Sequence, residues 1–160
     1  MLHSLICCNE DGYVLLARFF RPEMSLDARK EYEAELARVC GQVPHLWGDK
    51  SSKDKDKEPP DQLALCDGQY VVMRQVGELL LLLSGSDEYD ELMLSEIMSL
   101  LNAVLVTQLE KKLTEASLLA NYGKVVAALD EMVQQGHLET ADEATIDQMS
   151  KLRPFPTKLT

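Results

Sequence analysis

Asn121-Tyr-Gly-Lys-Val-Val-Ala-Ala-Leu-Asp-Glu-Met-Val-Gln-Gln-Gly-His-Leu-Glu-Thr140 is the stretch of sequence that says most about the fold. Its apolar residues recur every three or four positions and therefore share one face of an amphipathic helix. Gly136 is placed to end this helix, because glycine adopts a left-handed backbone at low cost. Thr140 and Glu143 then have the spacing of a capping box, which predicts a second helix. The predicted apolar face consists of Leu118, Tyr122, Val125, Val126, Leu129, Met132 and Val133.

A long helix is also predicted upstream, from about Asp90 to Leu109. One face is apolar at helical spacing, and the other side is rather apolar too, which predicts burial on two sides. We interpret Met93 and Met98 as core residues rather than as an adaptable binding surface. The first face carries Leu94, Ile97, Met98, Leu101, Val104 and Leu105, and the second carries Leu92, Met93 and Leu100.

The remaining periodic segments predict five strands and one more helix. The strands are expected at 2–8, 13–20, 62–66, 69–76 and 78–84, and the helix at 26–40. Short runs containing Gly12, Asp67-Gly68 and Gly77 separate neighbouring strands and have the composition of tight turns. The apolar run from Leu79 to Leu83 suits a central strand that is covered on both faces. We therefore predict an α/β (α+β) domain: one mostly antiparallel sheet, with the first helix on one face and the two long C-terminal helices on the other.

Periodicity is lost between 42 and 61, where Lys50-Ser-Ser-Lys-Asp-Lys-Asp-Lys-Glu-Pro-Pro60 is polar and balanced in charge. We expect a single domain over 1–150 with a mobile loop at about 48–61, followed by a proline-rich tail at 151–160. Ser51 and Ser52 are candidate phosphorylation sites that the sequence alone does not decide. Trp47, the only tryptophan, either fills a core edge or anchors a partner, and Phe155 either docks on a partner or lies in a loose tail.

Charge and composition argue against several classes of function. The net charge of −11 argues against nucleic acid and against unaided adhesion to anionic lipid. The longest apolar run is too short to span a bilayer, and the first residues lack the basic start of a secretory signal. We interpret the four cysteines as reduced thiols in the cytosol, because none forms a C-x-x-C pair and adjacent Cys7 and Cys8 point to opposite faces of a strand.

No pattern of catalytic, cofactor-binding or metal-ligating residues is present. His3, His45 and His137 have no partners at metal-ligand spacing, and no phosphate-binding glycine motif occurs. Asp130 and Glu131 are adjacent on a helix and so point about 100° apart, which does not suit paired acid–base work. The sequence therefore predicts a non-enzymatic protein without metal or cofactor.

Three segments resemble the small chains of heterotetrameric vesicle-coat adaptors, namely the sigma subunits of clathrin adaptors and the zeta subunit of the COPI coat. Residues 9–20, Asn-Glu-Asp-Gly-Tyr-Val-Leu-Leu-Ala-Arg-Phe-Phe, resemble the opening hairpin of this family. Residues 90–97, Asp-Glu-Leu-Met-Leu-Ser-Glu-Ile, resemble the entry to its long helix, and Asn121–Thr140 resembles a long helix segment that ends in Gly-x-Leu-x-Glu-Thr. The likeness covers about Met1 to Met149, interrupted only at 50–60, and within it the chain is most similar to the small subunit of TSET/TPLATE-type complexes.

The resemblance implies a longin-type (SNARE-like) fold and a peripheral cytoplasmic subunit that acts at plasma-membrane coated pits or the Golgi. It also implies two partners in the same complex: a large chain, whose N-terminal helical solenoid holds the subunit, and a medium chain. More apolar helix surface than one sheet face needs supports a permanent partner. The candidate contact residues are Trp47, Leu92, Met93, Leu100, Tyr122 and Phe155.

One departure from the family concerns cargo. Sigma chains help to bind acidic dileucine signals with a basic residue and an apolar pocket, and the matching positions here are Leu15, Asn102, Lys112 and Ser117. A leucine offers no partner for an acidic signal, and three polar residues make a poor pocket for leucine. We expect these positions not to bind such signals.

Three alternatives remain open at this stage. The first is a zeta-type COPI subunit in Golgi traffic. The second is a stand-alone longin-domain tether or SNARE regulator, which the absence of heptads or an anchor after Met149 disfavours. The third is a profilin-shaped ligand-binding domain, which would require converging polar groups that the sequence lacks.

Overall fold

The computed structural model describes residues 1–21, 23–43 and 61–151. A five-stranded sheet in the order β2-β1-β5-β4-β3 forms its centre, and every neighbouring pair is antiparallel. The central strand β5 is buried along its whole length, as expected for a strand covered on both faces. The strands are β1 (Leu2–Cys8), β2 (Val14–Phe19), β3 (Gln62–Cys66), β4 (Gln69–Val76) and β5 (Leu79–Gly85).

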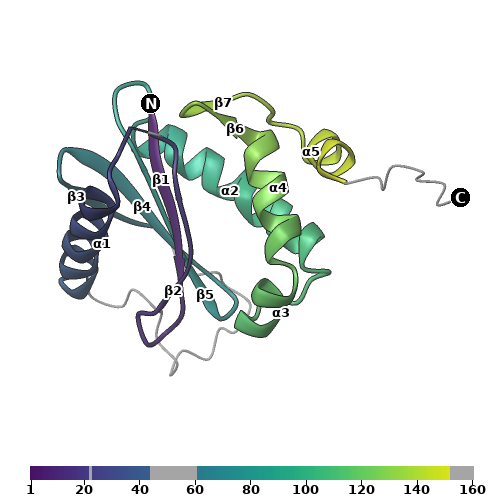
Figure 1. The fold of residues 1–160 in the computed structure, drawn as a ribbon, viewed down its shortest axis with the longest axis horizontal. Coiled ribbons are helices and arrows are strands. Elements are labelled where there is room, and N and C mark those ends of the chain that lie inside the picture. The colour runs from purple at the N-terminus through teal and green to yellow at the C-terminus, as the bar shows by residue number, and fades with distance from the viewer. Residues whose placement is uncertain (22, 44–60, 152–160) are drawn as a thin grey trace, which may run out of the picture.

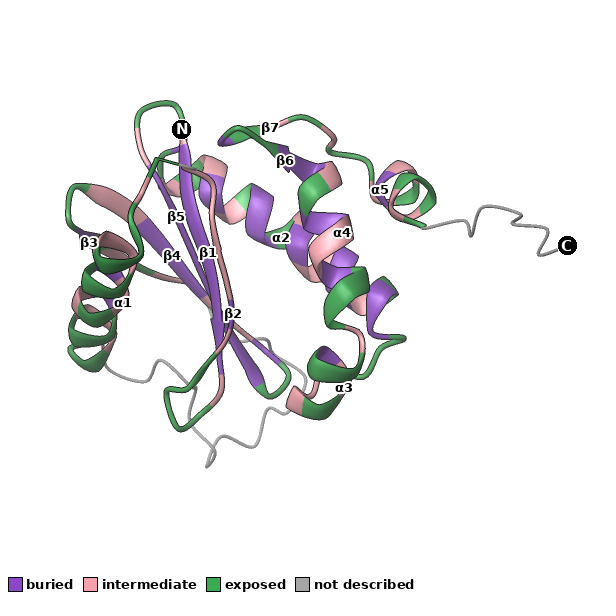
Figure 2. Cartoon of the chain, viewed as in Figure 1, coloured by how far each residue is buried: buried purple, intermediate pink, exposed green. Residues whose placement is uncertain are grey.

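Helices cover both faces of this sheet (Figure 1). Helix α1 (Leu26–Gly41) lies on one face and begins at Ser25, whose hydroxyl accepts a hydrogen bond from the Ala28 amide. Helices α2 (Glu91–Gln108) and α4 (Tyr122–Met132) lie on the other face. Burial is concentrated on the sheet and on the inner sides of these helices (Figure 2). This arrangement confirms the predicted sheet, the single helix on one face and the long pair on the other.

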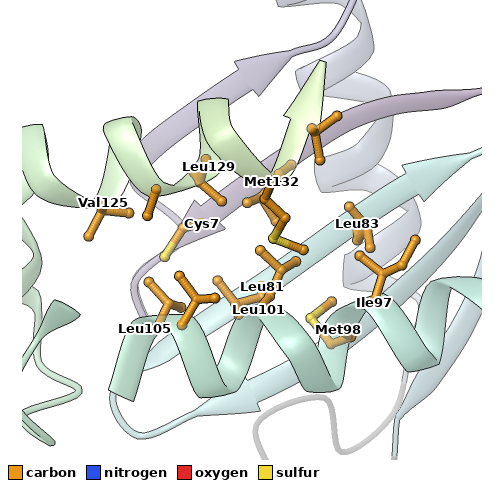
Figure 3. Packing of buried hydrophobic residues seen from close by; sticks show 14 of the residues in the cluster. Cys7, Leu81, Leu83, Ile97, Met98, Leu101, Leu105, Val125, Leu129 and Met132 are labelled. Carbon is orange, nitrogen blue, oxygen red and sulfur yellow. The ribbon is translucent and has the colours of Figure 1, made fainter. Parts of the chain in front are cut away.

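Two apolar cores result, one on each face of the sheet. The larger core packs α2 and α4 on the sheet, with side chains such as Leu81, Leu101 and Leu129 interdigitating (Figure 3). The smaller core lies under α1 and contains Tyr32 and Leu36. Cys7 belongs to the larger core and Cys8 to the smaller, which confirms that these adjacent residues point to opposite faces.

The C-terminal third departs from the prediction of one continuous helix before Gly136. Helix α3 (Glu115–Ala120) and α4 are separate, and within the described residues 86–151 four helices rather than three follow the last strand of the sheet. The break is at Asn121, whose backbone amide and side-chain amide both donate to the Ser117 carbonyl at the end of α3. Such local side-chain bonds compete with the helix, which is why asparagine favours helix ends.

Gly136 does not end a helix, contrary to the prediction. Helix α4 ends at Met132, and the chain continues as a small hairpin of β6 (Val133–Gln134) and β7 (His137–Leu138). Gln135 and Gly136 form its two-residue loop with φ values of 50° and 76°. Two consecutive positive φ values are typical of a type I′ turn, which matches the twist of the flanking strands. The glycine was correctly identified as left-handed, but it serves a hairpin.

The predicted capping box at Thr140 is wrong as well. The Glu139 and Thr140 amides both donate to the Met132 carbonyl, which holds this segment against the end of α4. Helix α5 (Glu143–Ser150) starts two residues later, at Asp142, whose carboxylate accepts from the amide and hydroxyl of Thr145. Asp is as effective an N-cap as Thr, and here the chain reaches helical geometry only after the Met132 contacts.

Candidate partner interface

Nine large apolar side chains are exposed among the described residues, and their positions define the candidate interfaces. Single exposed apolar residues are ordinary, whereas neighbouring ones indicate a contact surface. The nine are Tyr13, Val14, Leu26, Leu63, Leu65, Leu92, Leu119, Tyr122 and Met149.

Leu63 and Leu65 lie on β3, an edge strand that pairs only with β4 among the described residues. Leu63 is 54% and Leu65 is 66% exposed. The alternate residues of the strand, Ala64 and Cys66, pack under α1. Because side chains alternate along a strand, both leucines point to the face that α2 and α4 cover. Helix α2 does not extend over them, so this edge of the sheet presents apolar side chains to solvent.

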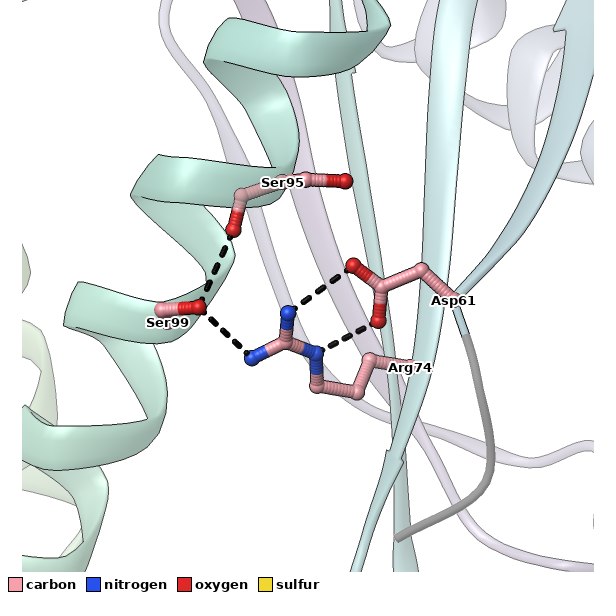
Figure 4. Close-up of polar contacts among 4 residues, drawn as sticks. All are labelled: Asp61, Arg74, Ser95 and Ser99. Atoms are coloured by element: carbon pink, nitrogen blue, oxygen red, sulfur yellow. Dashed lines mark hydrogen bonds and ion pairs between the residues drawn. The ribbon is translucent and has the colours of Figure 1, made fainter.

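Arg74 of β4 ties this edge to α2 (Figure 4). Its guanidinium donates two hydrogen bonds to the Asp61 carboxylate, Nε to Oδ1 at 2.6 Å and Nη2 to Oδ2 at 2.8 Å. Nη1 donates to the Ser99 hydroxyl at 3.1 Å, and this hydroxyl donates to the Ser95 carbonyl. The Arg74 and Asp61 side chains are only 14% and 18% exposed. This clamp fixes the start of β3 and the Ser95–Ser99 side of α2 relative to each other.

Leu92 lies on the same side of α2. It precedes Ser95 by three residues and Ser99 by seven, so the three share one stripe of the helix. Nearby Leu94 packs against Gly85 of β5. Gly85 lies opposite Tyr70 of β4, and Tyr70 lies opposite Leu65 of β3, so Leu92 is at the same height on the sheet as Leu65. Leu92 is 78% exposed. We call Leu63, Leu65, Tyr70 and Leu92 the β3–α2 surface.

The structure divides the contact residues predicted from sequence among separate places. Leu92 belongs to the β3–α2 surface, whereas Met93 and Leu100 are half-buried against the larger core. Tyr122, 41% exposed, starts α4 and neighbours exposed Leu119 at the end of α3. The other end of α4 leads into the β6–β7 hairpin, whose Leu138 amide donates to the Tyr89 hydroxyl just before α2. Trp47, Phe155, Ser51, Ser52 and most of the predicted mobile loop lie outside the described residues.

The four positions that correspond to a dileucine pocket belong to three elements and a connecting segment. Leu15 in β2 packs half-buried against the larger core, and Asn102 in α2 is half-buried. Lys112, between α2 and α3, is exposed, and Ser117 in α3 is half-buried. None of the four lines either of the two cavities described next.

One cavity of about 340 Å³ is acidic. It lies where the β1–β2 turn and the β4–β5 turn meet the start of α3, which the Asn9 side-chain amide joins by donating to Glu115. The Glu78 amide donates to the Leu113 carbonyl, and this bond holds the segment before α3 against the β4–β5 turn. The lining residues are Asn9, Glu10, Asp11, Gln75, Gly77, Glu78 and Glu115.

A second cavity of about 530 Å³ lies between α2, α4 and α5. Helix α5 is held there by polar contacts of its acidic residues: Thr107 donates to Glu143, and Gln108 donates to Asp147 at 3.0 Å. Ile146 is the one residue of α5 that is fully buried. The cavity walls carry charges of both signs on small or polar residues, namely Thr107, Gln108, Glu110, Gly123, Lys124, Ala127, Asp147, Ser150 and Lys151.

The titratable groups of the cores serve packing. Burial raises the pKa of Cys7 to about 12 and that of Cys8 to about 11, so these thiols stay protonated and are poor nucleophiles. Burial likewise raises the pKa of Tyr32, whose hydroxyl donates to the Ser84 hydroxyl at 2.7 Å. Within residues 1–21, 23–43 and 61–151, no three His, Cys, Asp or Glu side chains are arranged to hold a metal ion. No helix in these ranges is long and apolar enough to cross a membrane.

The sequence analysis missed Leu63 and Leu65 as surface residues. A signal was present, because the segment Gln-Leu-Ala-Leu-Cys (62–66) alternates and follows a non-periodic stretch, as an edge strand often does. The order of strands in the sheet was not predicted from the sequence, so neither leucine was expected at an edge of the sheet. The order β5-β4-β3 places this strand outermost, where α2 no longer covers it.

Comparisons with known proteins agree on the whole described fold. Residues 1–153 match the family described as clathrin adaptor complex small chain. The TSET complex member tstD of Dictyostelium discoideum is 27% identical over 154 residues, which span 96% of this chain and 94% of that protein. A chain in a homology model of the full-length AP-3 complex, in a stretched open conformation, superposes with a TM-score of 0.59. That chain is 15% identical, and the match covers 94% of this chain and 91% of that one.

Proposed function

The chain belongs to the clathrin adaptor complex small chain family and is a small subunit of an adaptor complex; we propose that this complex is of the TSET type and works in clathrin-mediated endocytosis. The observation that carries the proposal is the similarity to a TSET complex member over nearly the full length of both chains. The role is structural, with no catalytic step. The proposed location is the cytoplasmic side of coated pits, reached through the complex.

The partners in this proposal are a large chain, contacted through its N-terminal helical solenoid, and a medium chain. The β3–α2 surface supports contact with the large chain. Exposed Leu63, Leu65 and Leu92 lie beside the edge of β3 that no described strand pairs with, and the Arg74 clamp holds this surface in one shape before any partner binds. A rigid apolar surface loses little entropy when an apolar helix packs on it.

Affinity purification of the C-terminally tagged chain from its native cells, in mild salt, tests the proposal. We expect stoichiometric recovery of a large helical-solenoid chain and a medium chain, identified by mass spectrometry. Recovery of COPI chains would show instead that the protein is a subunit of the COPI coat. Recovery of a folded monomer alone would contradict the subunit role and favour a stand-alone longin-type domain.

The surface is tested by replacing exposed residues. Leu63→Glu/Leu65→Glu places two charges where a partner would have to bury them, so recovery of the large chain should fall at least about tenfold. Met149→Glu, at a 58% exposed position on α5, is the matched control and should leave recovery unchanged. Equal recovery with the double variant and the wild type would exclude the β3–α2 surface as the contact.

The proposal includes no recognition of acidic dileucine signals. Leu15 supplies no positive charge, and the cavity near α3 carries Glu10, Asp11, Glu78 and Glu115. Those carboxylates would repel the acidic residue of such a signal. In a titration of the purified complex with an acidic dileucine peptide and its Ala-Ala counterpart, we expect no difference. Specific binding that Leu15→Asp abolishes would contradict this part of the proposal.

A further inference from the structure

Two arginines at the α1 end of β2 have no ionic partner among the described residues. Arg21 follows β2 and Arg29 lies in α1, and both are half-buried. The Nε atom of each is inaccessible to solvent and has no hydrogen-bond partner within residues 1–21, 23–43 and 61–151. Buried donors without partners are rare in native proteins, so each one calls for an explanation. An unpaired guanidinium is especially unusual in a chain with a net charge of −11.

The two side chains gather around the same aromatic cluster. The Arg29 guanidinium carbon lies 5.6 Å from the centre of the Phe19 ring. That ring stands edge-on to His3, with ring centres 6.0 Å apart. Arg21 lies close enough to His3 for its charge to contribute, after burial, to the lowered pKa of that imidazole. Arg29 thus lies over the Phe19 ring and Arg21 lies near His3, so both positive charges are close to this aromatic cluster beside the α1 core.

Carboxylates near these arginines in the chain do not neutralise them. Glu23 and Glu33 are within a few residues, and Asp67 lies close enough to His3 to influence it, yet none forms an ion pair with Arg21 or Arg29 in the described structure. The other described arginines are paired: Arg18 with Asp130, Arg38 with Glu35 and Arg74 with Asp61. The missing counter-charge is thus particular to this site.

We propose that Arg21 and Arg29 form a cationic socket that receives an acidic side chain from another subunit of the complex; this rests on the proposed function. Arginine is the preferred residue for such contacts, because its planar fork bonds carboxylates in pairs and sheds water readily. Charge complementarity selects the occupant. The strongly acidic chain repels an anionic membrane surface as a whole, whereas a single carboxylate on a protein needs only the local pair of charges. The socket lies on the α1 side of the sheet, so it is a second contact, separate from the β3–α2 surface.

The test compares complexes purified through the tagged full chain across a range of salt concentrations. Arg21→Glu/Arg29→Glu should lower recovery of the partner subunit by about tenfold or more at low salt. Wild-type recovery should fall as salt rises, whereas Arg21→Met/Arg29→Met, which keeps the aliphatic packing, should recover less partner with a weaker dependence on salt. Lys30→Glu/Arg38→Glu makes the same change of charge on exposed positions of α1 and should behave as the wild type.

The outcomes separate this inference from the proposed function. If the wild type recovers no adaptor subunits, the proposed function fails. If it recovers them and both double variants at Arg21 and Arg29 recover as much, the socket is wrong. Flotation with vesicles of phosphatidylcholine containing phosphatidylserine tests whether the two arginines bind lipid instead of a protein. Wild-type flotation that the Met variant loses would assign the site to lipid and overturn the proposal. Circular dichroism of the Met variant checks that its fold is intact.

Discussion

The backbone amide of Leu2 donates a hydrogen bond of 2.7 Å to the carbonyl oxygen of Gly136. This contact joins the first strand of the sheet to the loop of the β6–β7 hairpin, which lies near the other end of the chain. The Leu138 amide is bonded in turn to the Tyr89 hydroxyl at 3.0 Å, just before α2. The hairpin therefore links β1, α2 and α4, the three elements that enclose the larger core.

Replacing Gly136 by alanine should lower the free energy of unfolding by about 2 kcal/mol. Gly136 has a φ of +76°, and an added Cβ would lie 3.0 Å from the Leu2 carbonyl oxygen and 2.6 Å from Met1 Cγ. Urea unfolding followed by circular dichroism measures the change. Gly12→Ala, with a φ of +85° but open space around it, isolates the backbone cost and should lose about 1 kcal/mol. A Gly136→Ala variant as stable as the wild type would contradict the close packing of this loop.

Removing the Arg74 side-chain charge with Arg74→Met should destabilise the domain by about 2–3 kcal/mol. The substitution leaves the Asp61 carboxylate, only 18% exposed, without its two hydrogen bonds. A double-mutant cycle with Asp61→Asn measures the coupling between the two side chains. The same cycle on Arg38 and Glu35, whose side chains are 58% and 41% exposed, should give a much weaker coupling, because solvent screens that pair. Equal coupling in the two pairs would contradict the clamp.

Stability should fall as the pH drops below about 6.5, because burial, and then Arg21, lowers the pKa of His3. The unfolded chain binds a proton near the ordinary value, whereas the folded chain binds it only at lower pH. Above pH 6.5 both states are neutral at this site and His3 contributes nothing. Below it the folded state holds fewer protons and loses stability, until the pH passes the lowered pKa. Asp67 acts in the opposite direction, and Tyr32 packs on the imidazole.

Thermal unfolding between about pH 5 and pH 7 tests this dependence. His3→Gln should flatten the profile over this range. The pKa of the Asp142 carboxyl is lowered from an ordinary value of 3.8, so its contribution to stability is lost only below that pH. Such carboxylates therefore do not affect the profile between about pH 5 and pH 7. An unchanged slope in His3→Gln would show that another group carries the effect.

The thiols should react slowly in the native protein at about pH 8. Burial raises the pKa of Cys7 and Cys40 to about 12, so little thiolate is present, and only Cys40 is partly accessible. Labelling with a chromogenic disulfide should proceed first at Cys40 and reach all four thiols only in denaturant. Rapid native labelling of Cys7 or Cys8 would contradict their place in the cores.

The sequence by itself determined the local elements. The turn residues Asp67-Gly68 and Gly77 helped to place β3 and β4 at their observed bounds. Period 3.6 placed the buried face of α2, because the side chains of one helix report which of its sides is buried. The family resemblance followed from motifs within such elements. The sequence also identified Gly136 as a left-handed position and Gly12 as part of a turn, since a positive φ is a local property of the backbone.

Only the tertiary structure decided how these elements meet. Leu63 and Leu65 are exposed because β3 is outermost in the sheet, and strand order depends on pairing between distant segments. Arg74 acts as a clamp only because Asp61 and Ser99 are brought to it from other elements. The β6–β7 hairpin, which replaced a predicted helix end, is held by the hydrogen bond between Leu2 and Gly136. Periodicity carries no information about such contacts, because it records which side of a segment is buried and not which segment buries it.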